Sequence, residues 1–81
     1  MDQPLPPLPT EPRPGRYRHY KGKEYRVLGL ARHSETLEPL VIYQALYGDP
    51  SALWVRPQPM FLETVRLAGV DTPRFQWISE A

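Results

Sequence analysis

The stretch EYRVLGLARHSETLEPLVIYQALY, residues 24–47, decides the fold of this chain. It contains two segments rich in β-branched and aromatic residues, 25–32 and 40–47, and we predict that both are strands. Gly29 interrupts the first segment and indicates a bulge or a sharp bend there. The polar hexapeptide HSETLE, residues 33–38, joins the two strands. Because loops on rigid β scaffolds often carry function, this connection is the first candidate site.

Strand-like segments continue on both sides of this stretch. Upstream, residues 16–20 predict a strand, and Lys21-Gly22-Lys23 supplies its turn because Gly22 can adopt a positive φ. Downstream, residues 48–51 predict a turn, and residues 53–56 predict a strand that Pro57 ends. The rest of the chain is expected to form one helical turn at 60–63, a loop at 65–72 and a closing strand at 75–78.

These elements predict an all-β fold of about five short strands with one helical turn, as a small, strongly bent SH3-like barrel or roll. An immunoglobulin-type sandwich would need about seven strands and about 100 residues. The predicted single domain covers residues 15–78, and residues 79–81 form a C-terminal tail. The chain of 81 residues has no cysteine, so its stability must come from the packing of aliphatic and aromatic side chains.

Residues 1–14 contain six of the eleven prolines and predict a disordered, extended tail, because proline fixes φ and removes a backbone donor. The tail has PxxP spacings, such as residues 6–9, that suit a docking peptide, but a solvated tail is the preferred interpretation. The N-terminus has neither a basic start nor an apolar stretch, and no run approaches the roughly 18 apolar residues of a membrane span. We therefore predict a soluble, cytoplasmic protein with no membrane partner.

The net charge of +1 conceals an asymmetry between the two halves of the chain. Residues 1–33 hold seven Lys/Arg against three acids, whereas residues 34–81 hold three Arg against six acids. The preferred interpretation is that the halves neutralise each other across the sheet. The alternative is nucleic-acid binding through the basic, tyrosine-containing segment 13–32, although the small overall charge counts against it.

Six candidate ligand-binding residues come from the polar connection and from the two strands that follow it. They are His33, Glu35, Glu38, Tyr43, Trp54 and Arg56. A larger aromatic set could line a groove or form the core, namely Tyr17, Tyr43, Tyr47, Trp54 and Phe75. Strand alternation puts Trp54 and Arg56 on one face if Leu53 and Val55 point inward. A planar guanidinium beside an indole would suit an anion or a peptide.

The polar connection has a structural and a chemical interpretation. In the first, its side chains cap an ordered turn, and Arg56 pairs with Glu35 or Glu38 to fasten it. In the second, His33 and the two carboxylates bind a metal or form an acid–base pair, as in a small metal-dependent or metal-free hydrolase. One imidazole is a poor ligand set, since catalytic zinc usually has three protein ligands. We therefore expect no metal, no cofactor and no catalytic residue.

Short sequence blocks follow one another along residues 15–78. They are Tyr17-x-His19-Tyr20-Lys21-Gly22, Tyr25-x-Val27, Ala31-x-His33-Ser34-Glu35-Thr36, Val41-x-Tyr43, Leu46-Tyr47, and Leu53-Trp54-Val55-Arg56-Pro57 with Met60-Phe61. In this order they resemble the small bacterial domain-of-unknown-function 1653 family. The resemblance implies an SH3-like barrel and brings no established activity, cofactor or catalytic residue.

The preferred hypothesis is thus a non-enzymatic binding or accessory module that uses one barrel face. Its partner would be a peptide, a protein or a small ligand, and nucleic acid is the less favoured choice. This preference rests on analogy from the predicted fold and not on a recognised site.

Overall fold

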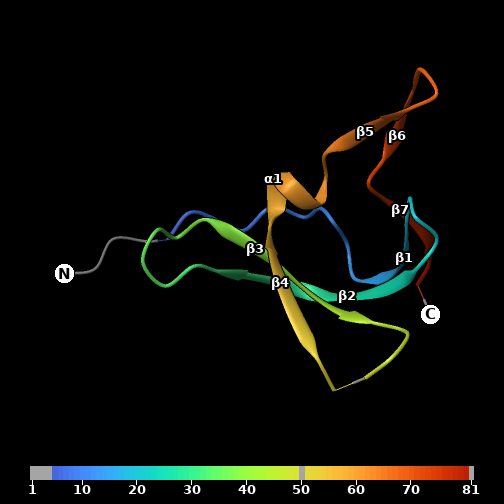
Figure 1. The fold of residues 1–81 in the computed structure, drawn as a ribbon. Coiled ribbons are helices and arrows are strands. Elements are labelled where there is room, and N and C mark those ends of the chain that lie inside the picture. Colours follow the sequence, from blue (N-terminus) through green and yellow to red (C-terminus); the bar gives the residue numbers. More distant parts are fainter. Residues whose placement is uncertain (1–4, 50, 81) are drawn as a thin grey trace.

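Seven strands and one helical turn make up the computed structural model, which describes residues 5–49 and 51–80 (Figure 1). In chain order they are β1 (Gly15–His19), β2 (Glu24–Arg32), β3 (Pro39–Ala45), β4 (Leu53–Pro57), α1 (Gln58–Phe61), β5 (Thr64–Leu67), β6 (Val70–Pro73) and β7 (Phe75–Ser79). The prediction of a mainly β fold with one short helical turn is confirmed. In the described part of the chain, no helix is long and apolar enough to cross a membrane.

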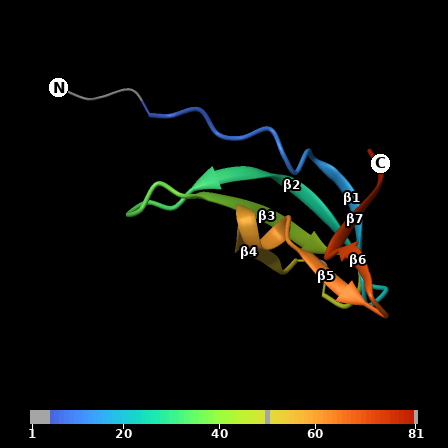
Figure 2. The ribbon, with the colours of Figure 1, turned by 90° about the horizontal axis from the view of Figure 1, so that it is seen from above.

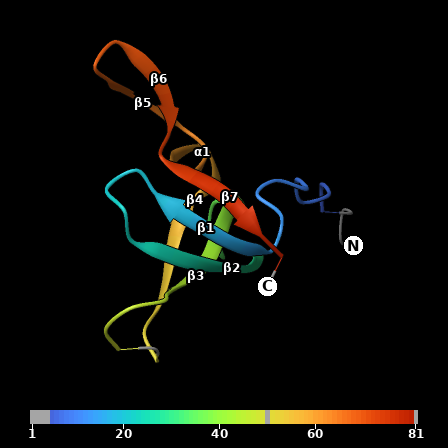
Figure 3. The same ribbon diagram turned by 90° about the vertical axis from the view of Figure 1, so that its right-hand side faces the viewer.

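The main sheet has five antiparallel strands in the order β4-β3-β2-β1-β7. Strands β4 and β7 are its two edges, and no pairing joins them in residues 5–49 and 51–80. The sheet is therefore bent and open, and the closed SH3-like barrel remains a prediction. Figure 3 shows β7 beside β1, and it shows the β5–β6 pair projecting away from the main sheet.

The central strand β2 contains the irregularity that Gly29 predicted. Val27 lies opposite Tyr43, and Gly29 lies opposite the preceding residue Ile42, so Leu28 is the extra residue of a bulge. A bulge bends its strand and increases the local twist, and β2 curves visibly along the sheet (Figure 2). The curvature gives the sheet a concave face, on which the core packs.

Residues 64–73 form a hairpin where the sequence predicted a loop at 65–72. Strands β5 and β6 pair from Thr64 opposite Pro73 to Leu67 opposite Val70. The turn residues Ala68 and Gly69 both have positive φ, 49° and 80°. Two consecutive positive φ values are typical of the tight hairpin turn for which Asn-Gly or Asp-Gly is the usual sequence signal. The prediction was wrong here because Ala68 gives no such signal, and the strand count rises from about five to seven.

The buried core combines four strands of the main sheet, β1, β2, β3 and β7, with the helical turn. It comprises Tyr17, Val27, Val41, Tyr43, Phe61 and Phe75. Phe61 is the last residue of α1, and its ring stacks on Phe75 with the centroids 4.1 Å apart. The turn begins directly after Pro57 and tolerates Pro59, because N–H groups in a first turn have no intrahelical partner. Helix α1 thus covers part of the concave face.

The described part of the N-terminal segment, residues 5–14, contains neither helix nor strand and runs alongside the domain (Figure 2). Residues 1–4 and 81 of the two predicted tails lie outside the described residues. The disorder predicted for 1–14 and the domain limits at 15 and 78 remain predictions. Residue 79 still belongs to β7.

Candidate ligand-binding site

Four aromatic side chains line a pocket of about 240 Å³ on the concave face of the sheet. They are Tyr25 from β2, Tyr43 from β3, Tyr47 from the segment after β3, and Trp54 from β4. The strand register explains how they meet. Trp54 lies directly opposite Tyr43 in the β3–β4 pair, and directly opposed residues of an antiparallel pair point to the same face.

The pocket has a buried floor and exposed walls. Tyr43 is only 6% exposed, whereas Tyr47 and Trp54 are 43% and 53% exposed. Tyr25 packs edge-on against both other tyrosines, with centroid distances of 5.5 Å to Tyr43 and 5.6 Å to Tyr47. Small-molecule sites usually enclose about 300–1,000 Å³. The pocket is smaller than that and fits one side chain or one ring of a larger partner.

A hydrogen bond of 2.7 Å joins the hydroxyl groups of Tyr25 and Tyr47. Burial and this hydrogen bond raise the pKa of Tyr25 to about 12. Tyr25 is therefore neutral at physiological pH and cannot act as a base there. The lining contains tyrosine and tryptophan alone, so the pocket offers aromatic faces and hydroxyl groups and no ionised group.

Cations surround the aromatic cluster. Arg56 donates from Nε to the Tyr43 hydroxyl over 3.3 Å, and its guanidinium lies 5.5 Å from the Phe75 ring centroid. Lys23 Nζ lies 4.4 Å from the centroid of the Tyr47 ring. The neighbouring His19 has a lowered pKa, because it is partly buried and because Arg74, Lys21 and Arg56 repel its charged form. The surroundings of the pocket therefore favour a negatively charged group over a positive one.

Three of the six predicted site residues come together at this pocket. Tyr43 and Trp54 line it, and Arg56 binds the hydroxyl of Tyr43. Trp54 and Arg56 share a face of the sheet as expected. It is the concave face, since Leu53 and Val55 on the opposite face are 58% and 61% exposed. The condition under which the sequence placed them together, that Leu53 and Val55 point inward, does not hold. Consecutive apolar residues in β4 left the alternation ambiguous, and the pairing of Trp54 with Tyr43 decides it.

The other three predicted residues, His33, Glu35 and Glu38, lie in the turn that joins β2 to β3, away from the pocket. His33 Nδ1 accepts hydrogen bonds from the backbone N–H groups of Glu35 and Thr36 at 3.0 and 3.3 Å. The backbone N–H of His33 donates to the carbonyl of Glu38 over 2.9 Å. His33 therefore caps the turn, as the structural interpretation predicted.

Neither catalysis at His33 nor fastening by Arg56 gains support from these contacts. The proton of a neutral His33 ring sits on Nε2, because Nδ1 is the acceptor. Arg56 contacts Tyr43 and Phe75 instead of the carboxylate of Glu35 or Glu38, so the predicted ion pair was wrong. Among residues 5–49 and 51–80, no group of three or more His, Asp and Glu side chains could hold a metal.

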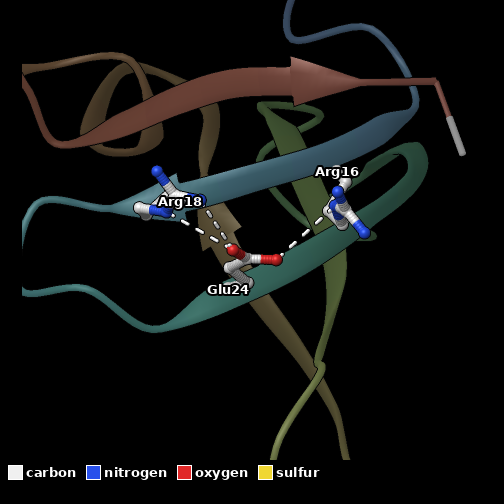
Figure 4. A network of polar contacts seen from close by, with 3 residues as sticks. All are labelled: Arg16, Arg18 and Glu24. Carbon is white, nitrogen blue, oxygen red and sulfur yellow. Dashed lines mark hydrogen bonds and ion pairs between the residues drawn. The ribbon is translucent and has the colours of Figure 1, made fainter.

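The basic segment 13–32 uses part of its charge within the chain. Arg16 and Arg18 flank Glu24 across the β1–β2 pair, with ion-pair distances of 3.5 and 2.9 Å (Figure 4). Carboxylate contacts of this kind reduce the positive charge available to phosphate groups. Two of the seven cations of the segment are thus in ion pairs, and nucleic-acid binding by the segment remains a prediction.

One lining residue, Tyr25, was absent from the aromatic set chosen from the sequence. The signal was present, since Tyr25 alternates with the core residue Val27 and therefore shares its face. Two members of that set, Tyr17 and Phe75, are buried in the core instead of lining the pocket.

Comparison with known proteins identifies relatives by sequence and by structure. Residues 15–77 match the family model described as "Protein of unknown function (DUF1653)". A solved structure, described as that of a protein belonging to DUF1653 from Bordetella bronchiseptica, is 40% identical and superposes with a TM-score of 0.79. The match covers 89% of this chain and 94% of that one. A comparison with curated proteins found no match.

Proposed function

Because the chain belongs to the DUF1653 family of unknown function, we propose its function from the site itself, as a non-enzymatic binding module. The pocket of Tyr25, Tyr43, Tyr47 and Trp54 holds one side chain or ring of the partner. We expect this module to act in the cytoplasm, in keeping with a chain that has no cysteine.

The observation that carries the proposal is the exposure of Trp54 beside a buried aromatic floor. Burying an indole releases a large apolar area, and tryptophan and tyrosine dominate the binding energy of many protein interfaces. Trp54 is half exposed although Tyr43, directly opposite, is buried. An aromatic or aliphatic group between Trp54 and Tyr47 would remove both walls from water.

The partner is a peptide segment with an apolar side chain and a nearby carboxylate. A peptide suits the site because β4 is an edge of the sheet, and an edge strand presents unpaired backbone groups to an extended chain. The carboxylate suits it because Arg56 and Lys23 border the pocket. A cationic side chain would meet these two charges and is disfavoured.

The test is a ¹H–¹⁵N NMR titration of the full chain with pools of acidic, neutral and basic peptides, each containing aromatic residues. We expect saturable shifts at Tyr25, Tyr47 and Trp54 with the acidic pool. The Trp54→Ala chain should lose these shifts. Leu53→Ala is the matched control, because Leu53 is equally exposed on the opposite face of the same strand.

Two results would contradict the proposal. If no pool perturbs the pocket residues, the pocket is not a peptide site. If Leu53→Ala abolishes binding while Trp54→Ala does not, the partner uses the outer face of the sheet.

A further inference from the structure

Three side chains of the domain donate hydrogen bonds to backbone carbonyl groups of the N-terminal segment. Arg32 of β2 donates to the carbonyl of Pro6, and Gln58 of α1 donates to that of Glu11 over 3.1 Å. Tyr17 of β1 donates to the carbonyl of Arg13 over 2.8 Å. These donors come from three separate elements and meet carbonyl groups along the whole length of residues 6–13.

This pattern matches the chemistry of an extended, proline-rich chain. Proline has no backbone N–H, and a polyproline-type chain makes no internal hydrogen bonds, so its carbonyl groups are free to accept. Side-chain donors such as arginine, glutamine and tyrosine complement such a chain without requiring donors from it.

Two side chains of the segment add specificity to these backbone contacts. Pro12 is less than 2% exposed, as little as the central core residues. The Arg13 guanidinium lies 3.6 Å from the centroid of the Trp77 ring, which is cation–π contact. Trp77 in turn packs edge-on against Tyr17, with the centroids 5.5 Å apart. The domain therefore buries Pro12 and stacks Arg13 on one of its own aromatic residues.

We propose that Arg32, Gln58, Tyr17 and Trp77 form a docking strip for extended proline-rich chains that contain a Pro-Arg pair. Residues 5–13 of the chain occupy this strip in cis. The external occupant is a proline-rich segment of a partner protein, which has the same chemistry and displaces the chain's own segment. The strip shares none of the four residues that line the aromatic pocket, so it is a second site that does not depend on the proposed function.

The cis segment sets the affinity that a partner needs. Residues 5–13 join β1 through Pro14 alone, and so short a tether gives the segment an effective concentration of about millimolar or above. A partner segment must bind tightly enough to compete with the chain's own segment. Weakening the contacts of the chain's own segment should therefore expose the strip. Arg13→Ala removes the cation–π contact from the occupant and leaves every residue of the strip in place.

The test uses the full-length Arg13→Ala chain and a synthetic peptide of residues 5–14. The indole N–H signal of Trp77, assigned with a Trp54→Phe variant, reports occupancy of the strip in NMR spectra. We expect Arg13→Ala to shift this signal, and we expect the peptide to return it saturably toward its wild-type position. A peptide with Ala at the positions of Pro12 and Arg13 is the matched control and should leave it unchanged. Gln58→Ala in the same chain should weaken peptide binding about two- to tenfold, the value of one hydrogen bond.

Two outcomes would overturn the proposal. One is a folded Arg13→Ala chain whose Trp77 signal does not respond to the peptide at about 1 mM, the range of the cis competition. The other is a dimeric wild-type chain with contacts between the segment of one copy and Trp77 of the next, which would assign the strip to a second copy. If the Arg13→Ala chain does not fold, the Arg13→Lys chain replaces it in the test, because lysine keeps the positive charge and loses the planar stacking on Trp77.

Discussion

Replacing Gly15 by Ala tests the packing at the start of β1. Gly15 has a φ of 149°, a conformation that residues with a side chain rarely adopt. A Cβ atom there would overlap Cζ3 of Trp77, and it would lie 2.6 Å from Cη2 of that ring and 2.8 Å from the carbonyl oxygen of Ser79. The Ser79 carbonyl is part of the backbone of β7, and the Trp77 ring is in contact with the Arg13 guanidinium, so neither can move away without losing contacts.

The cost of Gly15→Ala has two parts. Holding a residue with a side chain in such a backbone conformation costs about 1–3 kcal/mol. Forcing an extra carbon into a packed site costs about 1–3 kcal/mol more. We expect a loss of about 3 kcal/mol in the free energy of unfolding, which for a domain this small lowers Tm by about 12–24 °C.

Thermal and urea unfolding of two other glycine variants separates the two parts. Gly69 has a φ of 80° and open space around its Cβ position, so Gly69→Ala should show the backbone strain alone. Gly29 has neither a positive φ nor a close neighbour, so Gly29→Ala should change stability by less than about 0.5–1 kcal/mol. If Gly15→Ala is no more destabilising than Gly69→Ala, the close approach of Trp77 to Gly15 does not exist.

Three other perturbations test the core, the polar turn and the pH dependence. Phe61→Ala removes the buried ring that stacks on Phe75 and should cost about 3–5 kcal/mol in urea unfolding, enough to leave a small domain largely unfolded. His33→Ala removes the acceptor that caps the β2–β3 turn and should cost about 1 kcal/mol, whereas the side-chain oxygen of His33→Asn should restore most of it. Because the pKa of His19 is lowered in the fold, the unfolded chain takes up this proton first. Tm should therefore be highest above about pH 6.5 and fall below it, and His19→Gln should flatten that fall.

Most of the main sheet could be predicted because its strands carry strong local signals. Gly29 predicted the bulge of β2, and the aromatic residues at 75–77 predicted the strand that pairs with β1. The β5–β6 hairpin could not be predicted, because its turn uses Ala68 where an Asn or Asp would have given the signal. The face of β4 also could not be predicted, since Leu53, Trp54 and Val55 are all apolar and show no alternation.

The candidate site was predictable only in part, for a different reason. Tyr43, Trp54 and Arg56 were identified because aromatic and cationic residues on neighbouring strands suit recognition. The polar connection gives an equally strong signal in the sequence, because the sequence shows that His33 is ionisable but does not show what its Nδ1 atom contacts. In the fold that atom accepts two backbone hydrogen bonds. The role of such a residue depends on the turn geometry, which its neighbours in sequence do not determine.

The pocket exists because the helical turn is too short to cover the whole concave face. Phe61 contacts Tyr17, Tyr43 and Phe75, with centroid distances of 5.6, 5.6 and 4.1 Å. Helix α1 has four residues, and beyond Tyr43 the aromatic face continues to Trp54, which is 53% exposed. Tyr43 thus belongs to the core and to the pocket floor at once. Core packing fixes Tyr43, the floor of the pocket, in position before any partner binds. A partner would therefore only need to cover the part of the concave face that the helical turn leaves exposed.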